Sequence, residues 1–396
     1  MSALRPSIVI SAKPRISRIS LENWVTKTTD ETDRKYMQTA LALARRGLGQ
    51  VWPNPAVGCV LTDKGGNVVG RGWTQPGGRP HAETEALARA AGAARGGCAY
   101  VTLEPCAHFG ETPPCAKALI DAGIARVVVA MQDPDPRVSG RGVSMLAEAG
   151  VDVTVGVCED AAKDMNAGFV SRITHGRPLV TLKVASTLDG RIATVSGESK
   201  WITGEAARNR GHILRARNDA IIVGIDTVIA DDPDLRCRLP GMEGSSPLRV
   251  VFDTSLRIDG ASKLVAGAKD TPTWVFCVAG APRMRIEDLT KRSVEVIEAR
   301  PDAEGRPAVA DVLTRLAERG VTRVLVEGGG RLAAAFLKAR TVDRLAWFRA
   351  PVIIGGDGIP AIGGATVGRL ADAFGFERTG GIVAGNDVFE EFRRKE

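Results

Sequence analysis

The sequence predicts two successive α/β domains, and three observations indicate this fold class. Short apolar runs that resemble strands alternate with segments whose apolar residues recur at helical spacing, which is typical of layered domains with a largely parallel sheet. The alternation is interrupted at the Gly- and Pro-containing stretch His175–Pro178 and then resumes. The length of 396 residues also allows two or three domains.

The elements of the first domain each have a local signal. Apolar residues at helical spacing predict a helix over 33–47, with Asp33 as its N-terminal cap. The sequence Trp-Pro-Asn-Pro at 52–55 predicts a rigid turn, and Gly65-Gly66 predicts a hairpin. Strands are expected over 57–61, 68–72, 99–103, 126–131 and 151–157, and helices over 81–94, 115–122 and 142–149.

The second domain begins after a connecting helix, which is expected over 159–169. We place an N-terminal extension at 1–32, the first domain at 33–157, the connecting helix and linker at 158–178 and the second domain at 179–396. Apolar runs predict strands of the second domain over 179–184, 220–223, 248–253, 273–278, 321–327 and 345–350.

The N-terminal extension is rich in Ser, Arg and Lys and poor in acidic residues. An organelle transit peptide, a floppy bacterial N-terminus and a start codon assigned too early all fit this composition. We expect a disordered extension.

Charge and cysteine content narrow the class of protein. The net charge of +7 fits either an ordinary basic enzyme surface or attraction of a phosphorylated or polyanionic partner. Seven cysteines, an odd number spread along the chain, do not form a secreted disulfide framework. No apolar run reaches the roughly 18 residues of a membrane span. A cytoplasmic enzyme is therefore expected, with no membrane partner.

A candidate zinc site is formed by His81, Cys106 and Cys115. A zinc ion with three protein ligands keeps a fourth position for water, which is the composition of a catalytic site. Cys115 begins a predicted helix, whose dipole favours the thiolate. Glu83 lies two residues beyond His81, where it can exchange protons with the zinc-bound water and the leaving amine. These residues match the zinc nucleobase-deaminase signature.

The spacing of the two cysteines differs from the usual signature. That signature has two residues between its cysteines, whereas eight residues separate Cys106 from Cys115. His108 lies in this longer loop and has three open interpretations: a rival metal ligand, a substrate-facing residue or a surface histidine.

The first domain contains further motifs at Pro53–Gly58, Pro80–Glu83, Thr102–Cys106, Thr112–Cys115, Met131–Pro136 and Gly140–Val143. These stretches resemble the deaminase half of the bifunctional riboflavin-biosynthesis deaminase/reductase family. The long loop between the cysteines belongs to that family's pattern. The resemblance implies a cytidine-deaminase-like three-layer domain and deamination of 2,5-diamino-6-(5-phosphoribosylamino)pyrimidin-4(3H)-one. Asn54 is then a substrate contact, or otherwise a turn residue, and we expect His108 to face the substrate.

The second domain has weaker motifs of its own. Gly328–Gly330 follow a predicted strand and open an apolar helix, so they form either a phosphate-binding loop or a tight turn. They lack the Gly-x-Gly-x-x-Gly spacing of the usual dinucleotide fingerprint. Asp231 and Asp232 stand close to Arg236 and Arg238, an arrangement that also fits a solvated turn.

The second domain contains further motifs at 181–190, 201–204, 224–228 and 230–238. Together with the glycine motif, they resemble the reductase half of the same family. The resemblance implies a dihydrofolate-reductase-like α/β domain that uses NADPH to open the ribosyl ring of 5-amino-6-(5-phosphoribosylamino)uracil to a ribityl chain. Asp231 is the candidate for polar assistance to hydride transfer, and the guanidinium groups of Arg215 and Arg238 suit the phosphate. The positions expected to contact NADPH are Ala185, Trp201, Thr227, Asp231, Gly329, Gly330, Arg331, Leu332, Ala333, Ala334 and Ala335. Those expected to contact substrate are Lys183, Ser199, Arg215, Leu235, Arg238 and Glu327.

Two alternatives to the bifunctional enzyme remain. One is a deaminase whose reductase domain is inactive, which intact cofactor and substrate positions argue against. The other is a nucleic-acid base deaminase, which would need a basic surface studded with aromatic residues. Aromatic residues make up only 5% of the chain. We therefore expect a phosphoribosylated pyrimidine substrate, no nucleic-acid partner and a homo-oligomer.

Overall fold

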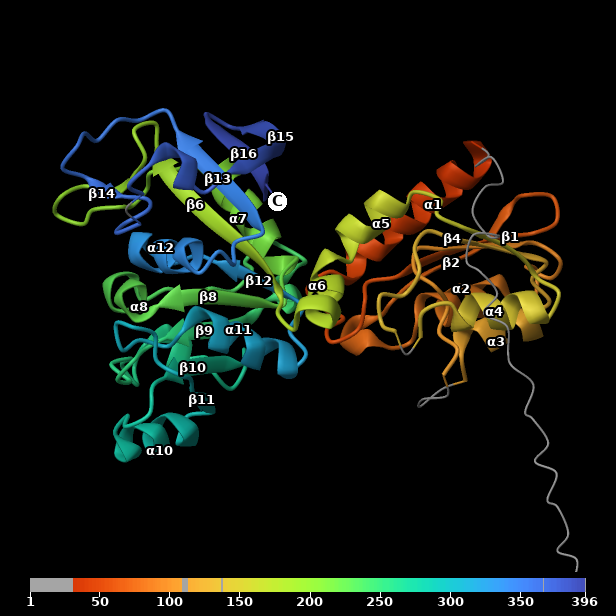
Figure 1. Cartoon of the computed structure of the whole chain (residues 1–396), viewed down its shortest axis with the longest axis horizontal. Helices are drawn as coiled ribbons and strands as arrows, with labels where there is room; N and C mark the ends of the chain where they lie inside the picture. The colour runs from red at the N-terminus through yellow and green to blue at the C-terminus, as the bar shows by residue number, and fades with distance from the viewer. Residues whose placement is uncertain (1–30, 109–112, 137, 366, 396) are drawn as a thin grey trace, which may run out of the picture.

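The computed structural model describes residues 31–108, 113–136, 138–365 and 367–395. Two α/β bodies lie side by side, each built on its own sheet, and the helices α5 and α6 lie between them (Figure 1). The predicted extension at 1–32 falls outside the described residues except for Glu31 and Thr32, which belong to the first helix, α1. The two-body architecture predicted from the sequence is confirmed.

The first sheet has the strand order β2-β1-β3-β4-β5. Its β1 pairs antiparallel with β2 and β3, whereas β3, β4 and β5 run parallel, so this sheet is mixed rather than largely parallel as predicted. The strands are β1 (Gly58–Thr62), β2 (Val68–Trp73), β3 (Cys98–Val101), β4 (Arg126–Val129) and β5 (Asp152–Val155).

Helices cover both faces of the first sheet, giving three layers (Figure 1). Two glycines permit the close packing: a Cβ on Gly58 would lie 1.9 Å from the Ala40 carbonyl oxygen, and one on Gly72 would lie 2.1 Å from that of Ala82. The helices α1 and α5 lie on one side, and α2, α3 and α4 on the other. The helices are α1 (Glu31–Ala44), α2 (Ala82–Ala90), α3 (Cys115–Asp121), α4 (Arg141–Glu148) and α5 (Glu159–Met165).

The expectation that Asp33 caps the first helix is wrong. The helix already begins at Glu31, and Asp33 is buried within its first turn. The Asp33 carboxylate accepts two hydrogen bonds from Arg126 on β4, at 2.8 and 2.7 Å. Pairing with the sheet, and not capping, therefore explains an acidic residue at this position.

The connecting segment forms two helices where the sequence predicted one. The first is α5, and the second is α6 (Ala167–His175), with the break at Asn166. The buried Asn166 side chain accepts a hydrogen bond from the Ala56 amide at 3.0 Å and donates one to the Ala56 carbonyl at 3.2 Å. This pairing fixes the helix break against the turn that carries Asn54.

The second sheet has nine strands in the order β11-β10-β9-β8-β12-β6-β13-β16-β15. Its first seven strands run parallel, as predicted, and the C-terminal hairpin adds two antiparallel strands. The strands are β6 (Leu179–Thr187), β8 (Ala220–Gly224), β9 (Leu248–Phe252), β10 (Thr273–Cys277), β11 (Val294–Glu298), β12 (Arg323–Val326), β13 (Arg344–Ala350), β15 (Phe376–Ala384) and β16 (Asp387–Arg394). A separate small sheet pairs β7 (Arg191–Ala193) with β14 (Ile359–Pro360).

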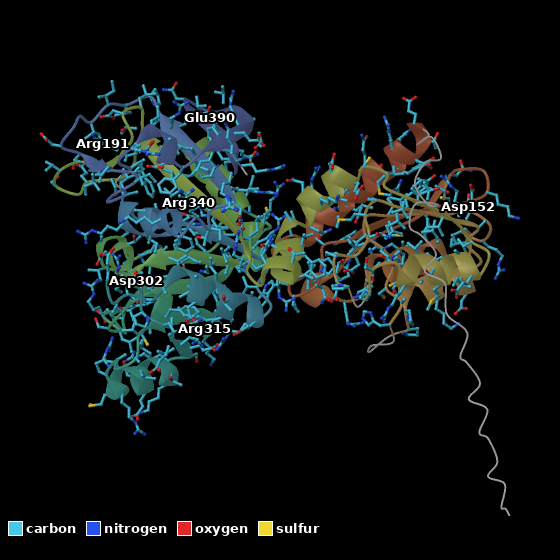
Figure 2. The ribbon with its side chains drawn as sticks, viewed as in Figure 1. Asp152, Arg191, Asp302, Arg315, Arg340 and Glu390 are labelled. Carbon is cyan, nitrogen blue, oxygen red and sulfur yellow. The ribbon has the colours of Figure 1, made fainter. Side chains whose placement is uncertain are left out.

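Helices α7 to α12 accompany the second sheet. Acidic and basic side chains project from both bodies, among them Asp152 from β5 and Arg315 from α11 (Figure 2). Among the described residues, no helix is both long and apolar enough to cross a membrane. The helices are α7 (Glu205–Ala216), α8 (Ile225–Asp231), α9 (Lys263–Ala266), α10 (Arg283–Lys291), α11 (Val309–Glu318) and α12 (Gly330–Lys338).

The end of α5 binds tightly to the second body. The buried Arg323 on β12 donates a hydrogen bond to the Met165 carbonyl at 2.6 Å, at the end of α5. Asp164 forms ion pairs with Arg344 at 2.6 Å and with Arg393 at 2.8 Å. The connection between the two bodies is therefore a packed interface and not a free linker.

Candidate functional site

The three predicted zinc ligands come together in the first body. His81 precedes α2, Cys106 follows β3 in a loop, and Cys115 begins α3. Their ligand atoms all lie within 4.8 Å of one another. The His81 Nδ1 atom is 3.3 Å from the Cys115 sulfur and 3.8 Å from the Cys106 sulfur. One imidazole and two thiols at these distances fit a zinc ion with one coordination position left open.

The protein environment favours a thiolate at Cys106. The Cys115 backbone amide donates a hydrogen bond to the Cys106 sulfur at 3.3 Å. The Cys115 thiol and the His81 ring lower the pKa of Cys106 to about 4, although burial opposes this shift. Because metal ligation requires the deprotonated thiol, Cys106 is prepared for it by the fold.

Glu83 lies in the first turn of α2 and is only 4% exposed. Burial raises its pKa to about 7, against the opposite effect of His81. Glu83 lines the same cavity as His81 and Cys106, as predicted for a group that exchanges protons beside the metal.

This cavity has a volume of about 150 Å³. Asn54 reaches it from the Pro-Asn-Pro turn, and a Cβ on Gly78 would lie 1.9 Å from the Asn54 Nδ2 atom, so the turn packs tightly beside the site. His108 also lines the cavity and does not belong to the group of ligand atoms, which disfavours its role as a rival ligand.

Two acidic residues at the cavity were not singled out from the sequence. Glu104 is buried and accepts hydrogen bonds from the backbone amides of Asp133, Gly140, Gly142 and Val143. It therefore holds that segment against the site. Burial raises the pKa of Asp133, which also lines the cavity, to about 6. A carboxylate directly after a buried strand was the available signal for Glu104.

A second site lies in the second body, at the carboxyl ends of β8 and β12. Two adjoining cavities of about 250 and 810 Å³ form it. This edge of a parallel sheet is where α/β proteins commonly bind ligands. Both cavities are lined by the predicted residues Lys183, Ser199, Trp201, Arg215, Arg238 and Glu327.

A network of ion pairs lines both cavities. Arg215 on α7 donates hydrogen bonds to both carboxylate oxygens of Glu327, at 2.8 and 2.9 Å. Lys183 on β6 lies 3.5 Å from the same carboxylate. Burial opposes ionisation of Glu327, but Arg215 and Lys183 lower its pKa to about 2. Glu327 is therefore a carboxylate at neutral pH, with acceptor capacity facing the cleft.

The two arginines predicted for the phosphate differ in their surroundings. The third nitrogen of Arg215 donates to the Arg236 carbonyl at 3.2 Å, so the pair with Glu327 and this bond occupy its guanidinium. Arg238 is exposed, and within the described part of the chain its guanidinium has no recorded partner. The structure thus separates a half-buried arginine, each of whose three nitrogens has a partner, from one that is available to a ligand.

The predicted cofactor positions lie on several segments. Ala185 lines the smaller cavity, and Thr227 and Asp231 line the larger one. The Gly329 amide, at the start of α12, donates to the Thr227 hydroxyl at 3.2 Å. Ala333 and Ala334 are buried and Arg331 is exposed, and none of the predicted residues 329–335 lines either cavity. Leu235 is 4% exposed and lines the larger cavity.

His212 was also not singled out from the sequence. It lies on α7 one turn before Arg215 and lines the smaller cavity. Its Nδ1 accepts a hydrogen bond from the Arg238 amide at 3.4 Å. Burial, followed by Arg215 and Arg238, lowers its pKa. The spacing of Arg208, His212 and Arg215 on one helix face was the available signal.

Comparisons with known proteins cover both bodies. The family model for the cytidine and deoxycytidylate deaminase zinc-binding region matches residues 30–131, and the model for the RibD C-terminal domain matches residues 178–375. Riboflavin biosynthesis protein RibD of Bacillus amyloliquefaciens is 44% identical over 328 residues, covering 83% of this chain and 86% of that protein. The Escherichia coli (strain K12) protein of the same name is 40% identical over 356 residues, covering 86% and 94%.

Solved structures agree with these matches over nearly the whole chain. Acinetobacter baumannii RibD superposes with a TM-score of 0.83 at 38% identity, covering 92% of this chain and 99% of that one. A Thermotoga maritima diaminohydroxyphosphoribosylaminopyrimidine deaminase/5-amino-6-(5-phosphoribosylamino)uracil reductase superposes with a TM-score of 0.80 at 34% identity, covering 92% and 99%. The predicted fold class of both domains is confirmed.

Proposed function

Since the chain belongs to the RibD family of bifunctional riboflavin-biosynthesis proteins, we propose which of its residues carry out the deamination and which the reduction. The family uses Zn²⁺ in the deaminase domain and NADPH in the reductase domain. The substrate proposed for the first step is 2,5-diamino-6-(5-phosphoribosylamino)pyrimidin-4(3H)-one, and its product, 5-amino-6-(5-phosphoribosylamino)uracil, is the substrate of the second.

For the deaminase we assign the metal to His81, Cys106 and Cys115. The single observation that carries this assignment is the convergence of their three ligand atoms within 4.8 Å beside a buried glutamate. When bound, zinc supplies the Lewis acidity that makes water a nucleophile at neutral pH. Glu83 takes up the proton that the attacking water loses and gives a proton to the departing amino group at C2.

The remaining residues of this cavity orient the pyrimidine. The Asn54 amide, fixed by the rigid turn, donates and accepts hydrogen bonds at the ring edge. His108 lies at the exposed side of the cavity, where it contacts the substrate. Glu104 acts indirectly, because its hydrogen bonds to four backbone amides hold the wall that contains Asp133.

For the reductase we assign the paired cavities of the second body to substrate and cofactor. When bound there, NADPH would supply the hydride for reduction of the ribosyl group at C1. Arg238 binds the phosphate of the substrate, whereas Arg215 keeps Glu327 in place as a hydrogen-bond acceptor for ribose hydroxyls. Lys183, Ser199 and Leu235 complete the substrate contacts, and Asp231 gives polar assistance to hydride transfer.

NADPH contacts are assigned to Trp201 and Thr227 at the larger cavity, and to the first turn of α12, which begins beside Thr227. Trp201, which is 69% exposed, lines both cavities and offers its ring to the nicotinamide or ribose. Thr227 and the first turn of α12, from Gly329 to Leu332, offer backbone and hydroxyl groups to the pyrophosphate. The buried Ala333, together with Ala334 and Ala335, supports this turn through packing.

The wider biology is proposed from the same residues. Because the zinc site needs free thiols, the reducing cytoplasm is the proposed compartment. We propose the phosphoribosylated pyrimidine as the partner, and we propose neither a nucleic-acid nor a membrane partner. The proposed assembly is a homo-oligomer. The domain limits remain those proposed from the sequence, except that the deaminase domain begins at Glu31, where α1 starts.

One experiment tests both halves. Zinc-loaded protein is given the diamino-pyrimidinone ribotide with NADPH, and ammonia and NADPH are followed together. Ribotide-dependent loss of NADPH supports both activities, because the reductase acts on the deaminated product. Ammonia release without NADPH loss would favour a deaminase with an inactive reductase domain. Absence of ammonia release would refute the deaminase assignment.

A further inference from the structure

The loop 231–238 carries much of the proposed reductase site and has an unusual backbone. It contains Asp231, Leu235 and Arg238, and it borders the larger cavity. Asp232 and Leu235 have φ values of +39° and +60°. Residues with a side chain rarely adopt such values unless the surroundings enforce them. The contacts of the loop with its neighbours therefore determine its conformation.

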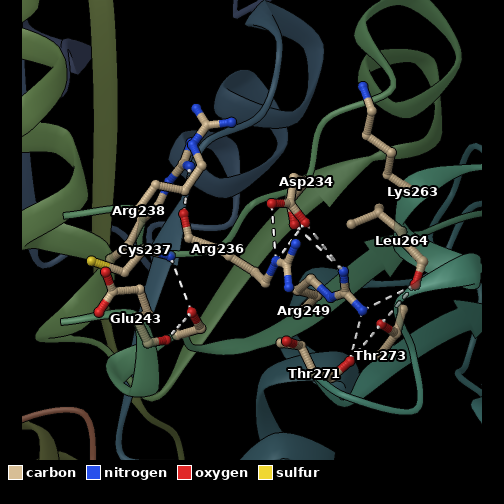
Figure 3. Close-up of polar contacts among 12 residues, drawn as sticks. Asp234, Arg236, Cys237, Arg238, Glu243, Arg249, Lys263, Leu264, Thr271 and Thr273 are labelled. Atoms are coloured by element: carbon tan, nitrogen blue, oxygen red, sulfur yellow. Dashed lines mark hydrogen bonds and ion pairs between the residues drawn. The ribbon is translucent and has the colours of Figure 1, made fainter. Parts of the chain in front are cut away.

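Arg249 on β9 lies beneath this loop and is fully buried (Figure 3). Its Nη2 donates hydrogen bonds to the Leu264 carbonyl at 3.0 Å and the Thr271 carbonyl at 2.7 Å. Its Nη1 donates to the Asp234 carbonyl at 3.5 Å and lies 3.9 Å from the Asp234 carboxylate. One guanidinium thus joins the loop 231–238 to the segment 262–271.

Both joined segments border the larger cavity. Asp234 comes from the loop side, and Lys263 and Gly267 come from the opposite segment. A Cβ on Gly267 would lie 3.4 Å from the Arg249 Nη1 atom, so the segment 262–271 packs directly against the guanidinium. Arg249 itself is not among the residues that line the cavity. Arg249 can therefore influence a ligand only through the loop 231–238 and the segment 262–271.

Packing alone does not explain an arginine at this position. Burial lowers the pKa of Arg249 to about 10, and its Nε has no hydrogen-bond partner among the described residues. Replacing buried charges by apolar side chains of similar volume is often neutral or stabilising. An apolar side chain, however, cannot bond three backbone carbonyls on two separate segments.

We propose that Arg249 is a positioning residue of the reductase, which sets the loop 231–238 against the segment 262–271 and thereby fixes where Asp231 and Arg238 meet cofactor and substrate. This inference rests on the proposed placement of NADPH and the phosphorylated substrate in the paired cavities.

The test compares Arg249→Met with Arg323→Met. Arg323 is a matched control, because it is also buried, burial also lowers its pKa to about 10, and it also bonds backbone carbonyls, two where Arg249 bonds three. Those carbonyls belong to Asp164 and Met165, at the interface between the two bodies and not at the cavities. NADPH oxidation with 5-amino-6-(5-phosphoribosylamino)uracil, ammonia release and thermal melting are measured for each full-length holoenzyme.

We expect Arg249→Met to lose roughly 10- to 100-fold in reductase kcat/KM, with KM for the uracil substrate raised and ammonia release unchanged. Arg249→Lys keeps the positive charge but not the planar guanidinium with its several N–H donors, and it should recover part of this loss. Arg323→Met should lower the melting temperature and leave reductase KM unchanged. Equal effects of the two Met variants on reductase KM, or an unchanged KM in Arg249→Met, would overturn the proposal.

A second variant covers the case in which Arg249→Met does not fold. Asp234→Ala removes the carboxylate contact from the loop side, and it is expected to raise reductase KM in the same direction. An unchanged KM in this variant would also overturn the proposal. Wild-type protein that does not oxidise NADPH with the uracil substrate would refute the proposed function instead, so the two failures are distinguishable.

Discussion

Arg215 and Glu327 form a two-pronged ion pair between α7 and the end of β12, with both carboxylate oxygens bonded by one guanidinium. The pair spans residues far apart in sequence and lies where the two reductase cavities meet. Removing Glu327 leaves Arg215 without a counter-charge, whereas removing Arg215 leaves Glu327 with Lys183 at 3.5 Å.

Glu327→Gln should reduce the NADPH-dependent step strongly while deamination continues. The neutral amide no longer compensates Arg215, and the acceptor proposed for ribose hydroxyls is lost. We expect a fall of roughly 100-fold in reductase kcat/KM, as for a misplaced site. NADPH oxidation with the uracil substrate measures the fall, and ammonia release from the diamino substrate is the control. A reductase rate near that of the wild type would remove Glu327 from the site.

The same pair predicts a pH dependence of stability. Glu327 has a folded-state pKa of about 2, below its ordinary value of 4.5. A lowered carboxylate pKa contributes stability that is present above pH 4.5 and is lost as the pH falls toward 2. The measurement is the free energy of unfolding in urea for the wild type and Glu327→Gln at pH 6, 4 and 3, which is roughly the window set by these pKa values. The stability gap between them should narrow as the pH falls; a constant gap would contradict the assignment.

Glu83→Gln should abolish ammonia release while zinc stays bound. The variant keeps the volume of the side chain but cannot take up the proton of the attacking water, and loss of a general base costs about 10²- to 10⁴-fold. Metal analysis establishes that zinc remains, and NADPH oxidation with the uracil substrate should be normal. Wild-type ammonia release in this variant would exclude Glu83 from proton transfer.

Removal of zinc should separate the two activities. The three ligands lie in the first body only, so a chelator, or the variant Cys106→Ser, should stop ammonia release. Reduction of supplied uracil substrate should continue at an unchanged rate, because the reductase cavities contain none of these ligands. Loss of both activities on chelation would mean that the metal also supports the second body.

Asp231→Asn should slow reduction and spare deamination. Asp231 lines the larger cavity at 4.0 Å from Lys200, and the substitution removes its charge while keeping its shape. The measurement is NADPH oxidation under saturating uracil substrate beside ammonia release from the diamino substrate. Equal impairment of both steps would contradict the division into two independent sites.

Much of this architecture was predictable because it depends on sequence patterns between residues that are close together in the chain. The alternation of strands and helices and the Gly/Pro punctuation at His175–Pro178 predicted the two bodies. The zinc ligands were predictable because their residue types and spacing are specific, although His81 and Cys115 are far apart in sequence. The cofactor positions rested on resemblance, since no Gly-x-Gly-x-x-Gly fingerprint is present.

The features that sequence reasoning missed depend on tertiary contacts. The hairpin of β15 and β16 was not predicted because β15 is mostly exposed and has no apolar alternation. Asp33 looked like a cap because its partner Arg126 lies 93 residues away. The break at Asn166 depends on hydrogen bonds with Ala56, 110 residues away, which no local pattern reveals.

The clamping of the end of α5 by Arg323, Arg344 and Arg393 has a kinetic consequence. A deaminase joined through a packed interface does not act as a swinging arm that delivers its product. The uracil ribotide has to travel while the two catalytic centres stay in place. Fusion then guarantees equal numbers of the two centres.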